Sequence, residues 1–515
     1  MHVARRCGKK IKKSLLQLAK SLVEFSGPAE SQTLPRGFEN SDFPMGLPQN
    51  KTKIVVTIGP ASKSVEVLEQ MILAGMNVAR LNFSHGSFDD HAEAIANIRA
   101  VSARAQRRVA IMADLPGPKM RLGEIPGGPF ELHYGDSFIL TSDDCDGDVH
   151  RVSMSFDSLP KVVHEGDRLF LNDGLVQLLV DHVSGNDVHC KVVVGGPVSS
   201  RKGLNLPRIA LGIGAFTEHD RACLKFALGE GVDAVSQSFV ENASDIEAVR
   251  AAAAELGHAP FIIAKIERSE ALEQFEEILA VSDGIMVARG DLGVEVPIEN
   301  MAVIQKQLIA KANKASKPVI TATQMLESMT ISRLPTRAEA TDVANAILDG
   351  TDCVMLSGES AVGAFPVDAV SMLARIAVSA EKHRHATHMQ PAWKEIEFGG
   401  AGAEKKGLLI EHAIELSECD VVFAPTRSGN TARAVARWRS PVWVIALGSV
   451  PSAMQGLAFS SGVHPVDLEE DPEDWTPYTR EMVKILGIPC ERILLITGPS
   501  VRNPNANQRL ELITC

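Results

Sequence analysis

Eight short runs rich in β-branched residues recur along the chain, and segments with helical patterning separate most of them. Alternating strands and helices predict parallel β/α units, and eight such units predict a closed (β/α)8 barrel. The runs span residues 53–59, 77–83, 109–115, 233–239, 261–267, 284–290, 318–324 and 353–359. We therefore expect an α/β protein built around a TIM barrel.

The alternation is interrupted twice, and each interruption predicts a further domain. Between Arg121 and Pro207, strand-like pieces are separated by Gly, Asp and Asn turns, which is typical of an inserted all-β module. Past about residue 381, new strand-like runs at 421–426, 442–447 and 492–498 predict a smaller α/β domain. The expected boundaries are an extension at 1–50, barrel segments at 51–122 and 208–390, the inserted β domain at 123–207, and the C-terminal domain at 391–515.

Charge and cysteine content limit the partners and the compartment. The 515 residues include 52 Lys and Arg against 64 Asp and Glu, a net charge of −12, which disfavours a nucleic-acid-coating protein and points to small-molecule partners. The eight cysteines form no C-x-x-C pair that would resemble a zinc or redox site, and their scattered positions favour a reducing, cytoplasmic location. No apolar run reaches the length of about 18 residues that spans a membrane, so we expect no membrane partner.

The first 25 residues differ in charge from the rest of the chain. No acidic residue occurs in the first 20 positions, and Arg and Lys surround a leucine-containing stretch. This pattern predicts a basic amphipathic helix, which we interpret as a dispensable extension. That interpretation includes an early start codon upstream of Met45, and a transit peptide or a membrane-surface helix is the alternative. Residues 26–51 are rich in Pro, Gly, Ser and Asn and predict a linker.

Charged residues follow two neighbouring strand-like runs. Lys265 and Glu267 are two residues apart at the end of one run, so their side chains point to the same face. Asp291 directly follows the next run, after Gly290. Because active sites of such barrels lie at the carboxyl ends of the strands, the two carboxylates predict a Mg²⁺ site and Lys265 a positive charge for a phosphoryl group. An ion pair at a strand end is the alternative interpretation.

Further polar residues fit the same rim. Arg80, Asn82 and Ser84 alternate with apolar residues and so share one face, which suits Arg80 to phosphate binding. Thr323 offers a hydroxyl at a strand end, although threonine is also an ordinary strand residue. The loop at 114–123 combines Asp114, Lys119 and Arg121 with Gly and Pro, a composition that suits phosphate but is also found in solvated loops.

Six ordered strings together resemble the pyruvate kinase family. The resemblance is strong over residues 51–390 and moderate over 405–450, and it is specific because the strings occur in combination. The strings are TKIVVTIGPAS at 52–62, ARLNFSHG at 79–86, KGLNLP at 202–207, SDGIMVARGDLG at 282–293, ATQMLESM at 322–329 and PTRAEATDVANAILDGTDCVMLSGES at 335–360.

The resemblance implies phosphoryl transfer from phosphoenolpyruvate to ADP, giving pyruvate and ATP, with Mg²⁺ or Mn²⁺ as cofactor and a homotetrameric assembly. It implies catalytic roles for Lys265, Thr323 and Arg80, and substrate contacts from these three together with Gly290 and Asp291. Glu267 and Asp291 resemble the metal ligands. The residues that resemble the nucleotide side of the site are Asn82, Ser84, His85, Arg121 and Lys202.

One departure from the family concerns the monovalent cation. Many members hold potassium with groups that match Asn82, Ser84, Asp114 and the residue at 115, and carry Thr where this chain has Leu115. They also carry Glu where this chain has Lys119. Since the Lys119 ammonium can supply the missing positive charge, we hypothesise that potassium is not required.

Two weaker motifs remain. The segment containing Thr426, Ser428, Gly429, Asn430 and Thr431 lies between a strand and a helix and resembles the family's effector-phosphate loop. The tail at 497–515 departs from that of the fructose-bisphosphate-activated members, so the effector's identity stays open. Ser357 and Glu359 suit either a proton relay or a plain strand-end turn.

Two other functions were weighed. A metal-dependent barrel lyase would also use a Glu/Asp pair for Mg²⁺, but it would need neither the inserted domain nor Lys202 and Lys265. A catalytically silent relative would be expected to have lost charged site residues, and all five central ones are present: Arg80, Lys265, Glu267, Asp291 and Thr323.

Overall fold

The computed structural model describes residues 46–172, 174–209, 212–387, 402–498 and 509–515. The predicted N-terminal helix, and the linker as far as residue 45, lie outside these residues. The chain divides into two compact units, which we describe separately. One unit begins at Gln49, contains the barrel and the inserted module, and includes residues 455–461. The other contains residues 402–454 and 462–515 as far as they are described.

The eight predicted barrel strands are present and close into a parallel barrel in the order β1-β16-β15-β14-β13-β12-β3-β2, which confirms the predicted fold class. Nearly all of their residues are buried, which is why they appear in the sequence as continuous apolar runs. The strands are β1 (Lys53–Thr57), β2 (Val78–Asn82), β3 (Ala110–Leu115), β12 (Ala234–Gln237), β13 (Phe261–Ile266), β14 (Gly284–Ala288), β15 (Val319–Ala322) and β16 (Cys353–Leu356).

Several of the helices that cover the barrel begin at residues suited to capping. Ser87, Thr217 and Thr336 each form a capping box at the start of a helix, which satisfies otherwise unpaired backbone N–H groups. Their apolar faces pack on the barrel in one large core. The helices are α2 (Val65–Ala74), α3 (Phe88–Arg104), α5 (Glu218–Gly229), α6 (Ala243–Glu255), α7 (Ser269–Glu273), α8 (Phe275–Val281), α9 (Arg289–Glu295), α10 (Met301–Lys314), α11 (Arg337–Asp349), α12 (Gly358–Ala361) and α13 (Pro366–Thr387).

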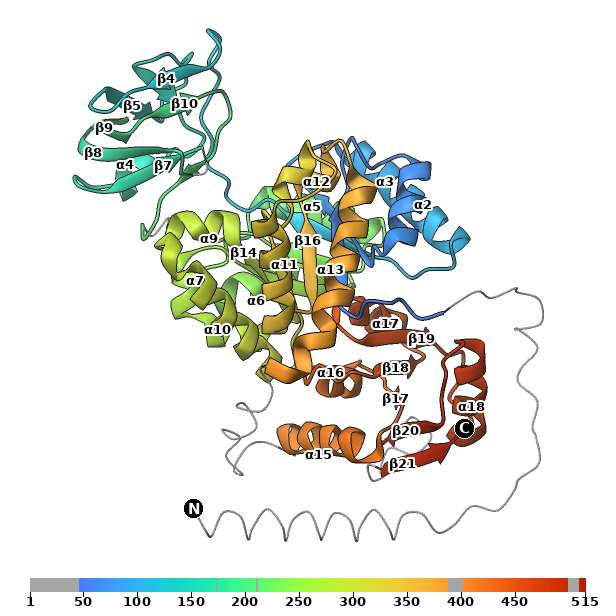
Figure 1. Cartoon of the computed structure of the whole chain (residues 1–515). Coiled ribbons are helices and arrows are strands. Elements are labelled where there is room, and N and C mark those ends of the chain that lie inside the picture. The colour runs from blue at the N-terminus through green and yellow to red at the C-terminus, as the bar shows by residue number, and fades with distance from the viewer. Residues whose placement is uncertain (1–45, 173, 210–211, 388–401, 499–508) are drawn as a thin grey trace. The chain divides into compact units, whose positions relative to one another are not determined.

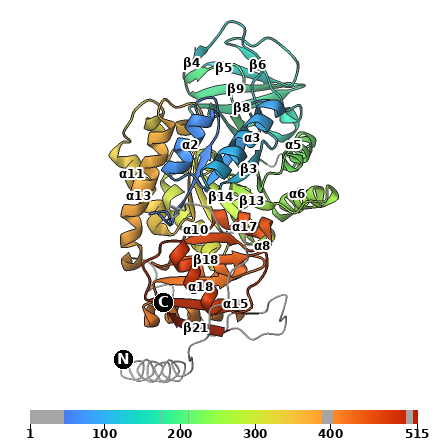
Figure 2. The ribbon, with the colours of Figure 1, turned by 90° about the vertical axis from the view of Figure 1, so that its right-hand side faces the viewer.

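The segment between β3 and α5 forms a β module with its own core (Figures 1 and 2). Six strands form one sheet in the order β11-β7-β8-β9-β5-β6, and β10 pairs with β4 in a second. The only helix among its described residues is the four-residue α4 (Leu159–Val162). The strands are β4 (Phe130–Leu132), β5 (Ser137–Thr141), β6 (Arg151–Ser153), β7 (Arg168–Leu171), β8 (Val176–Ser184), β9 (Asp187–Val194), β10 (Gly196–Val198) and β11 (Leu204–Asn205).

The C-terminal unit contains a five-stranded sheet in the order β19-β18-β17-β20-β21. The three predicted strands are its centre, β17 (Val421–Pro425), β18 (Trp443–Gly448) and β20 (Arg492–Thr497). The two edge strands, β19 (Val463–Asp467) and β21 (Arg509–Thr514), were not predicted, because their exposed residues break the apolar run. The helices are α15 (Gly402–Ser417), α16 (Asn430–Ala436), α17 (Pro451–Gly456) and α18 (Trp475–Ile485).

Residues 455–461, which we expected to belong to the C-terminal domain, cluster with the barrel instead. Phe459 is buried and stacks on Phe261, with ring centroids 5.4 Å apart. The carbonyl of Phe459 accepts a hydrogen bond from Cys353 Sγ at 3.2 Å, and Ser461 N donates to Asp352 Oδ1 at 2.9 Å. This short segment therefore completes the core between the barrel strands.

Candidate active site

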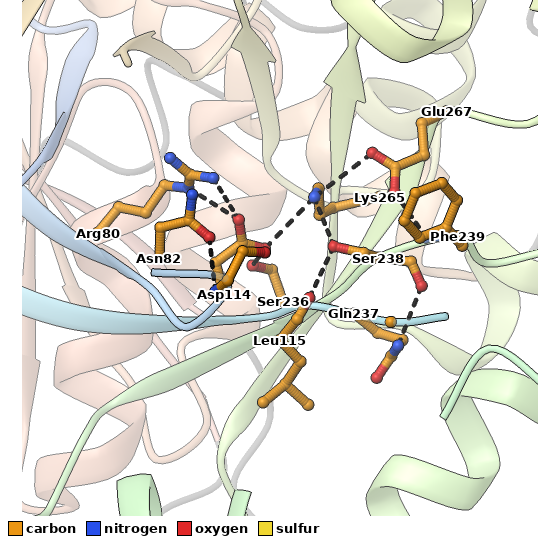
Figure 3. A network of polar contacts seen from close by, with 12 residues as sticks. Arg80, Asn82, Asp114, Leu115, Ser236, Gln237, Ser238, Phe239, Lys265 and Glu267 are labelled. Carbon is orange, nitrogen blue, oxygen red and sulfur yellow. Dashed lines mark hydrogen bonds and ion pairs between the residues drawn. The ribbon is translucent and has the colours of Figure 1, made fainter. Parts of the chain in front are cut away.

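The carboxyl ends of neighbouring barrel strands bring four charged side chains together (Figure 3). Arg80 lies on β2, Asp114 on β3, and Lys265 on β13, which Glu267 follows directly. All four are at least nine-tenths buried. Buried charges are stable only when they are paired, so the contacts among these groups determine what the site can do.

Arg80 and Asp114 form the first pair. The guanidinium donates from Nε to Asp114 Oδ2 at 2.9 Å and also from Nη2 to the same oxygen, while Nη1 donates to Thr57 Oγ1 at 2.9 Å. Ser236 Oγ donates to Asp114 Oδ1 at 2.6 Å. Burial would raise the pKa of Asp114, but Lys265 and Arg80 outweigh it and hold that pKa at about 2. The carboxylate is thus a fixed negative charge that orients two cations.

Lys265 lies between two carboxylates. Its Nζ donates to Ser238 Oγ at 2.6 Å and lies 3.4 Å from Glu267 Oε2 and 3.5 Å from Asp114 Oδ1. Burial alone would lower the pKa of Lys265, but the two carboxylates raise it. The site therefore contains a permanently charged ammonium that is shielded from water, where its electrostatic effect on a reacting group is large.

Glu267 has one oxygen without a hydrogen bond. Phe239 N donates to Oε1 at 2.6 Å, whereas the buried Oε2 accepts no hydrogen bond from any described residue and has only the Lys265 ion pair. Burial, opposed by Lys265 and reinforced by Asp291, raises the pKa of Glu267 to about 7. An orphaned carboxylate oxygen that is repelled by a second carboxylate fits a divalent cation.

The number of ligands also fits magnesium. Within the described ranges there is no group of three or more His, Cys, Asp and Glu side chains placed to hold a metal. Mg²⁺ is usually bound by one or two carboxylates, with water and substrate oxygens completing its shell. Glu267 and Asp291 are a donor set of that kind.

Gly290 and Thr323 are brought together at the ends of β14 and β15. Gly290 N donates to Thr323 Oγ1 at 2.7 Å, and that hydroxyl donates to the carbonyl of Ala322 at 2.7 Å. Thr323 has a φ of +66°, an unusual conformation for a β-branched residue. The hydroxyl is thereby held in one orientation beside the first turn of α9, which carries Asp291.

The missed residue Arg289 fixes this geometry. Its guanidinium donates to the carbonyls of Ala322 at 3.1 Å and Thr323 at 2.8 Å, and to Asp342 Oδ2 at 2.6 Å. The sequence shows Arg289 beside Gly290 and Asp291, but nothing in the spacing indicates that it reaches back to the end of a different strand.

Two crossings join the barrel to the inserted module, and they pair with each other. Leu122 N donates to the carbonyl of Lys202 at 2.9 Å, and Leu204 N donates to that of Met120 at 3.0 Å. Arg121 Nη1 donates to the carbonyl of Arg201 at 2.9 Å. The predicted nucleotide residues Arg121 and Lys202, 81 positions apart in the sequence, therefore lie on adjacent, hydrogen-bonded segments.

Neighbouring charged groups of the site shift the pKa values of both His85 and Lys119. Partial burial lowers the pKa of His85, and the cations of Lys119, Arg121 and Arg80 lower it further. Loss of solvent and the charge of Lys265 lower the pKa of Lys119, whereas Asp291 and Glu267 raise it. Although the Lys119 side chain is still exposed at the rim, it belongs to the site's electrostatic environment.

The other groups expected to bind a monovalent cation already form hydrogen bonds or ion pairs within the protein. Both oxygens of Asp114 have cationic or hydroxyl partners, and Asn82 Oδ1 accepts a hydrogen bond from Ser84 N at 3.1 Å. Leu115 contributes its carbonyl, which accepts from Ser238 Oγ at 2.7 Å. The contacts of Asp114 and of the Leu115 carbonyl are drawn in Figure 3.

Two serines of β12 and the turn after it were also missed. Ser236 and Ser238 lie two residues apart and donate to Asp114 and to the Leu115 carbonyl, respectively. Their alternation in DAVSQSF was the available signal. Glu359, in contrast, accepts hydrogen bonds from Leu326 N at 3.0 Å and Ser357 N at 2.7 Å, so both its oxygens tie backbone in place.

The predicted effector loop belongs to the C-terminal unit. Gly429 has a φ of +81°, and its N–H donates to Thr426 Oγ1 at 3.0 Å. Arg433 donates to the Ser428 carbonyl at 2.7 Å and to Asn430 Oδ1 at 3.1 Å. Asn430 begins the seven-residue α16, in which Thr431 is the second residue. The loop thus forms a compact turn held by its own side chains.

Comparison with known proteins gives a consistent result. A family model described as the pyruvate kinase barrel domain matches residues 49–370, and one described as the pyruvate kinase alpha/beta domain matches residues 408–495. A pyruvate kinase of Thermococcus litoralis is 47% identical over 437 residues, which cover 83% of this chain and 90% of that protein. A human pyruvate kinase is 43% identical over 442 residues, which cover 82% of this chain and 76% of that protein.

A solved structure agrees. The crystal structure of a pyruvate kinase from Cryptosporidium parvum superposes with a TM-score of 0.84 at 36% sequence identity, covering 91% of this chain and 96% of that one. No helix in the part of the chain that the structure describes is long and apolar enough to cross a membrane.

Proposed function

The chain belongs to the pyruvate kinase family, and we propose from its site how it carries out that family's reaction, phosphoryl transfer from phosphoenolpyruvate to ADP to give pyruvate and ATP. The observation that carries the proposal is the buried, permanently charged Lys265 ammonium between Asp114 and Glu267. Such a transfer needs positioning and charge neutralisation more than covalent chemistry by the protein.

The charged groups have separate tasks. Lys265 and Arg80 face the transferring phosphoryl group and neutralise the charge that develops on its oxygens as its bond to the enol oxygen breaks and its bond to ADP forms. Asp114 holds both cations in position through its two oxygens. Glu267 and Asp291 would hold Mg²⁺ or Mn²⁺, which would supply further positive charge to the reacting phosphoryl group.

The second step gives a proton to the enolpyruvate carbon. We assign to Thr323 the side from which this proton reaches the carbon. The Thr323 hydroxyl accepts a hydrogen bond from Gly290 N and donates one to the Ala322 carbonyl. Asn82, Ser84, His85, Arg121 and Lys202 form the nucleotide side, because Arg121 and Lys202 lie on the paired crossings between barrel and inserted module. Pairing of the crossings supports closure of the module over the barrel mouth, which excludes water.

We also propose that the reaction does not require potassium. Lys119 is a cation in the electrostatic field of Asp291 and Glu267, which raise its pKa, and the Asp114 carboxylate is fully occupied by Arg80, Ser236 and Lys265. The test is a coupled assay of pyruvate formation from phosphoenolpyruvate and ADP with Mg²⁺, with and without potassium. A large rise in activity on adding potassium to a potassium-free, sodium-free assay would refute this part of the proposal.

Replacement of the central lysine tests the site itself. Lys265→Met should lower kcat by roughly 10²-fold or more, because it removes a charge that stabilises the transition state. Lys225→Met, a lysine on the surface helix α5, serves as the matched control and should keep the wild-type rate. Retention of a tenth of the wild-type rate by the folded Lys265→Met protein would contradict the role assigned to Lys265.

We carry over two properties of the family as proposals, the oligomeric state and a binding site for an effector. A homotetramer is expected, and sedimentation velocity of the purified chain measures it directly. A phosphorylated effector is expected at the loop from Thr426 to Thr431, where hydroxyl groups and backbone N–H groups are concentrated in a turn. A phosphate ester that shifts the substrate dependence of the wild type but not of Thr431→Ala would support it.

A further inference from the structure

Two cysteine side chains that are distant in the sequence are in contact in the C-terminal unit. Cys490 precedes β20 and Cys515 follows β21, and their Sγ atoms lie 2.6 Å apart. This separation is longer than a disulfide bond of about 2.05 Å, and both residues are free thiols. Cys515 is exposed and Cys490 partly exposed, so a dissolved reagent can reach the pair.

The backbone on both sides holds the two thiols together. β20 and β21 are antiparallel, with Arg492 opposite Thr514, and Cys515 N donates to the Glu491 carbonyl at 2.9 Å. Asp420 Oδ2 accepts hydrogen bonds from Glu491 N at 2.7 Å and Arg492 N at 2.9 Å. The pair therefore meets at the end of a fixed hydrogen-bonded ladder, and no strand has to move for the sulfurs to react.

We propose that Cys490 and Cys515 form a site of reversible oxidative modification, at which a low-molecular-weight disulfide such as glutathione disulfide converts the two thiols into an intrachain disulfide. None of the residues assigned to phosphoryl transfer takes part in it. The proposal therefore goes beyond the proposed function and does not depend on it.

The reaction balances in two exchange steps. The Cys515 thiolate attacks one sulfur of glutathione disulfide, forming a mixed disulfide and releasing one glutathione thiolate. Cys490 then loses its proton to solvent and attacks Cys515 Sγ, which forms the intrachain bond and releases the second glutathione. Burial, with the neighbouring Cys515, raises the pKa of the Cys490 thiol, so the exposed Cys515 is the first nucleophile.

The modification would change the edge of the sheet. β21 is the outermost strand of the sheet and pairs with β20, and most of its residues are exposed. A disulfide at its end would fasten it covalently to the chain before β20. Oxidation is therefore expected to slow amide hydrogen exchange across β21 by at least roughly tenfold, since such edge strands open locally.

Peptide mapping provides the test. The folded full-length protein is incubated with glutathione disulfide, its remaining thiols are alkylated with iodoacetamide, and it is digested with trypsin without reduction. Cleavage after Lys484, Arg492 and Arg509 places Cys490 in peptide 485–492 and Cys515 in peptide 510–515. We expect these two peptides to be linked, with a loss of about 2 Da from the intact chain that dithiothreitol reverses.

Two variants sharpen the result. Cys515→Ser should abolish both the linked peptide and the loss of mass. Cys145→Ser removes another partly exposed free thiol, in the inserted module, and should leave both unchanged. A Cys515 that carries glutathione while Cys490 is alkylated would overturn the proposal, as would a cross-link from either residue to another cysteine. Unchanged exchange across β21 in the linked protein would overturn the proposed fastening of that strand.

Discussion

Arg268, which directly follows the metal-binding candidate Glu267, is the clearest case in which one buried side chain should control the stability of the barrel unit. It is only 2% exposed and donates from Nη2 to the Ile209 carbonyl at 3.1 Å. Its guanidinium also lies 3.3 Å from Glu270, 3.5 Å from Glu241 and 3.9 Å from Glu295. Burial raises the pKa values of Glu241 and Glu295, and Arg268 opposes that shift.

Replacing Arg268 with Met should destabilise the barrel unit by about 3–5 kcal/mol, because it leaves three carboxylates without their shared cation. The matched control is Arg104→Met. Arg104 pairs with Glu69 at 2.9 Å on the surface and is 54% exposed, so its loss should cost less than about 1 kcal/mol.

Hydrogen exchange of the amides in β13 and β14 measures the difference within the intact protein. A cost of about 3–5 kcal/mol corresponds to protection factors roughly 10²- to 5 × 10³-fold lower in Arg268→Met for amides that exchange through opening of the barrel. Equal protection in the two variants would refute the reasoning, because it would mean that the buried cluster contributes no more than a surface ion pair.

Three further predictions follow from other parts of the structure. Gly117→Ala should destabilise the fold by about 1–2 kcal/mol, because the φ of Gly117 is +66° and an added Cβ would lie 2.9 Å from Phe239 Cδ2. Since Phe239 N donates to Glu267, the variant should also need more Mg²⁺ for half-maximal activity. A magnesium titration measures this concentration, and an unchanged value would contradict the prediction. Lys119→Glu should run roughly 10²-fold slower without potassium and recover when potassium is added, as measured in the coupled assay; equal rates without potassium would deny Lys119 its role. Burial, with Glu415, raises the pKa of Glu411 to about 8, so the folded protein keeps this carboxyl protonated. The contribution of Glu411 to the free energy of unfolding is therefore complete below pH 4.5 and is lost as pH rises through 8, by at most about 1.4 kcal/mol per pH unit. Glu411→Gln should flatten that slope in urea titrations between pH 4.5 and 8.

The sequence predicted the barrel well because its strands are buried on both faces, which leaves runs such as those of β1 and β14 apolar throughout. It did not predict β19 or β21, whose partly exposed residues lack such a run. Edge strands are defined by pairing with a neighbour, and that pairing is not encoded in local patterning.

The candidate site shows the same division. Lys265 and Glu267 were found because a two-residue spacing on a strand fixes a common face, and the structure brings them within 3.4 Å. Ser238 and Arg289 were not found, since the alternation that contains Ser238 also occurs in ordinary strands and the Arg289 side chain reaches another strand's end. The contact between Cys490 and Cys515 likewise depends on strand pairing that the sequence alone did not reveal.

Because residues 455–461 belong to the barrel unit, the chain cannot be divided into its two units at a single point. A truncation at the predicted domain boundary near residue 390 would remove Phe459 from its stack on Phe261 and leave Asp352 without the Ser461 N–H. The barrel would then expose an apolar surface that its own sequence between 49 and 390 cannot cover. Gene fragments that exchange the C-terminal domain between relatives must therefore carry this segment with the barrel, so the unit of recombination includes a piece from within the C-terminal domain.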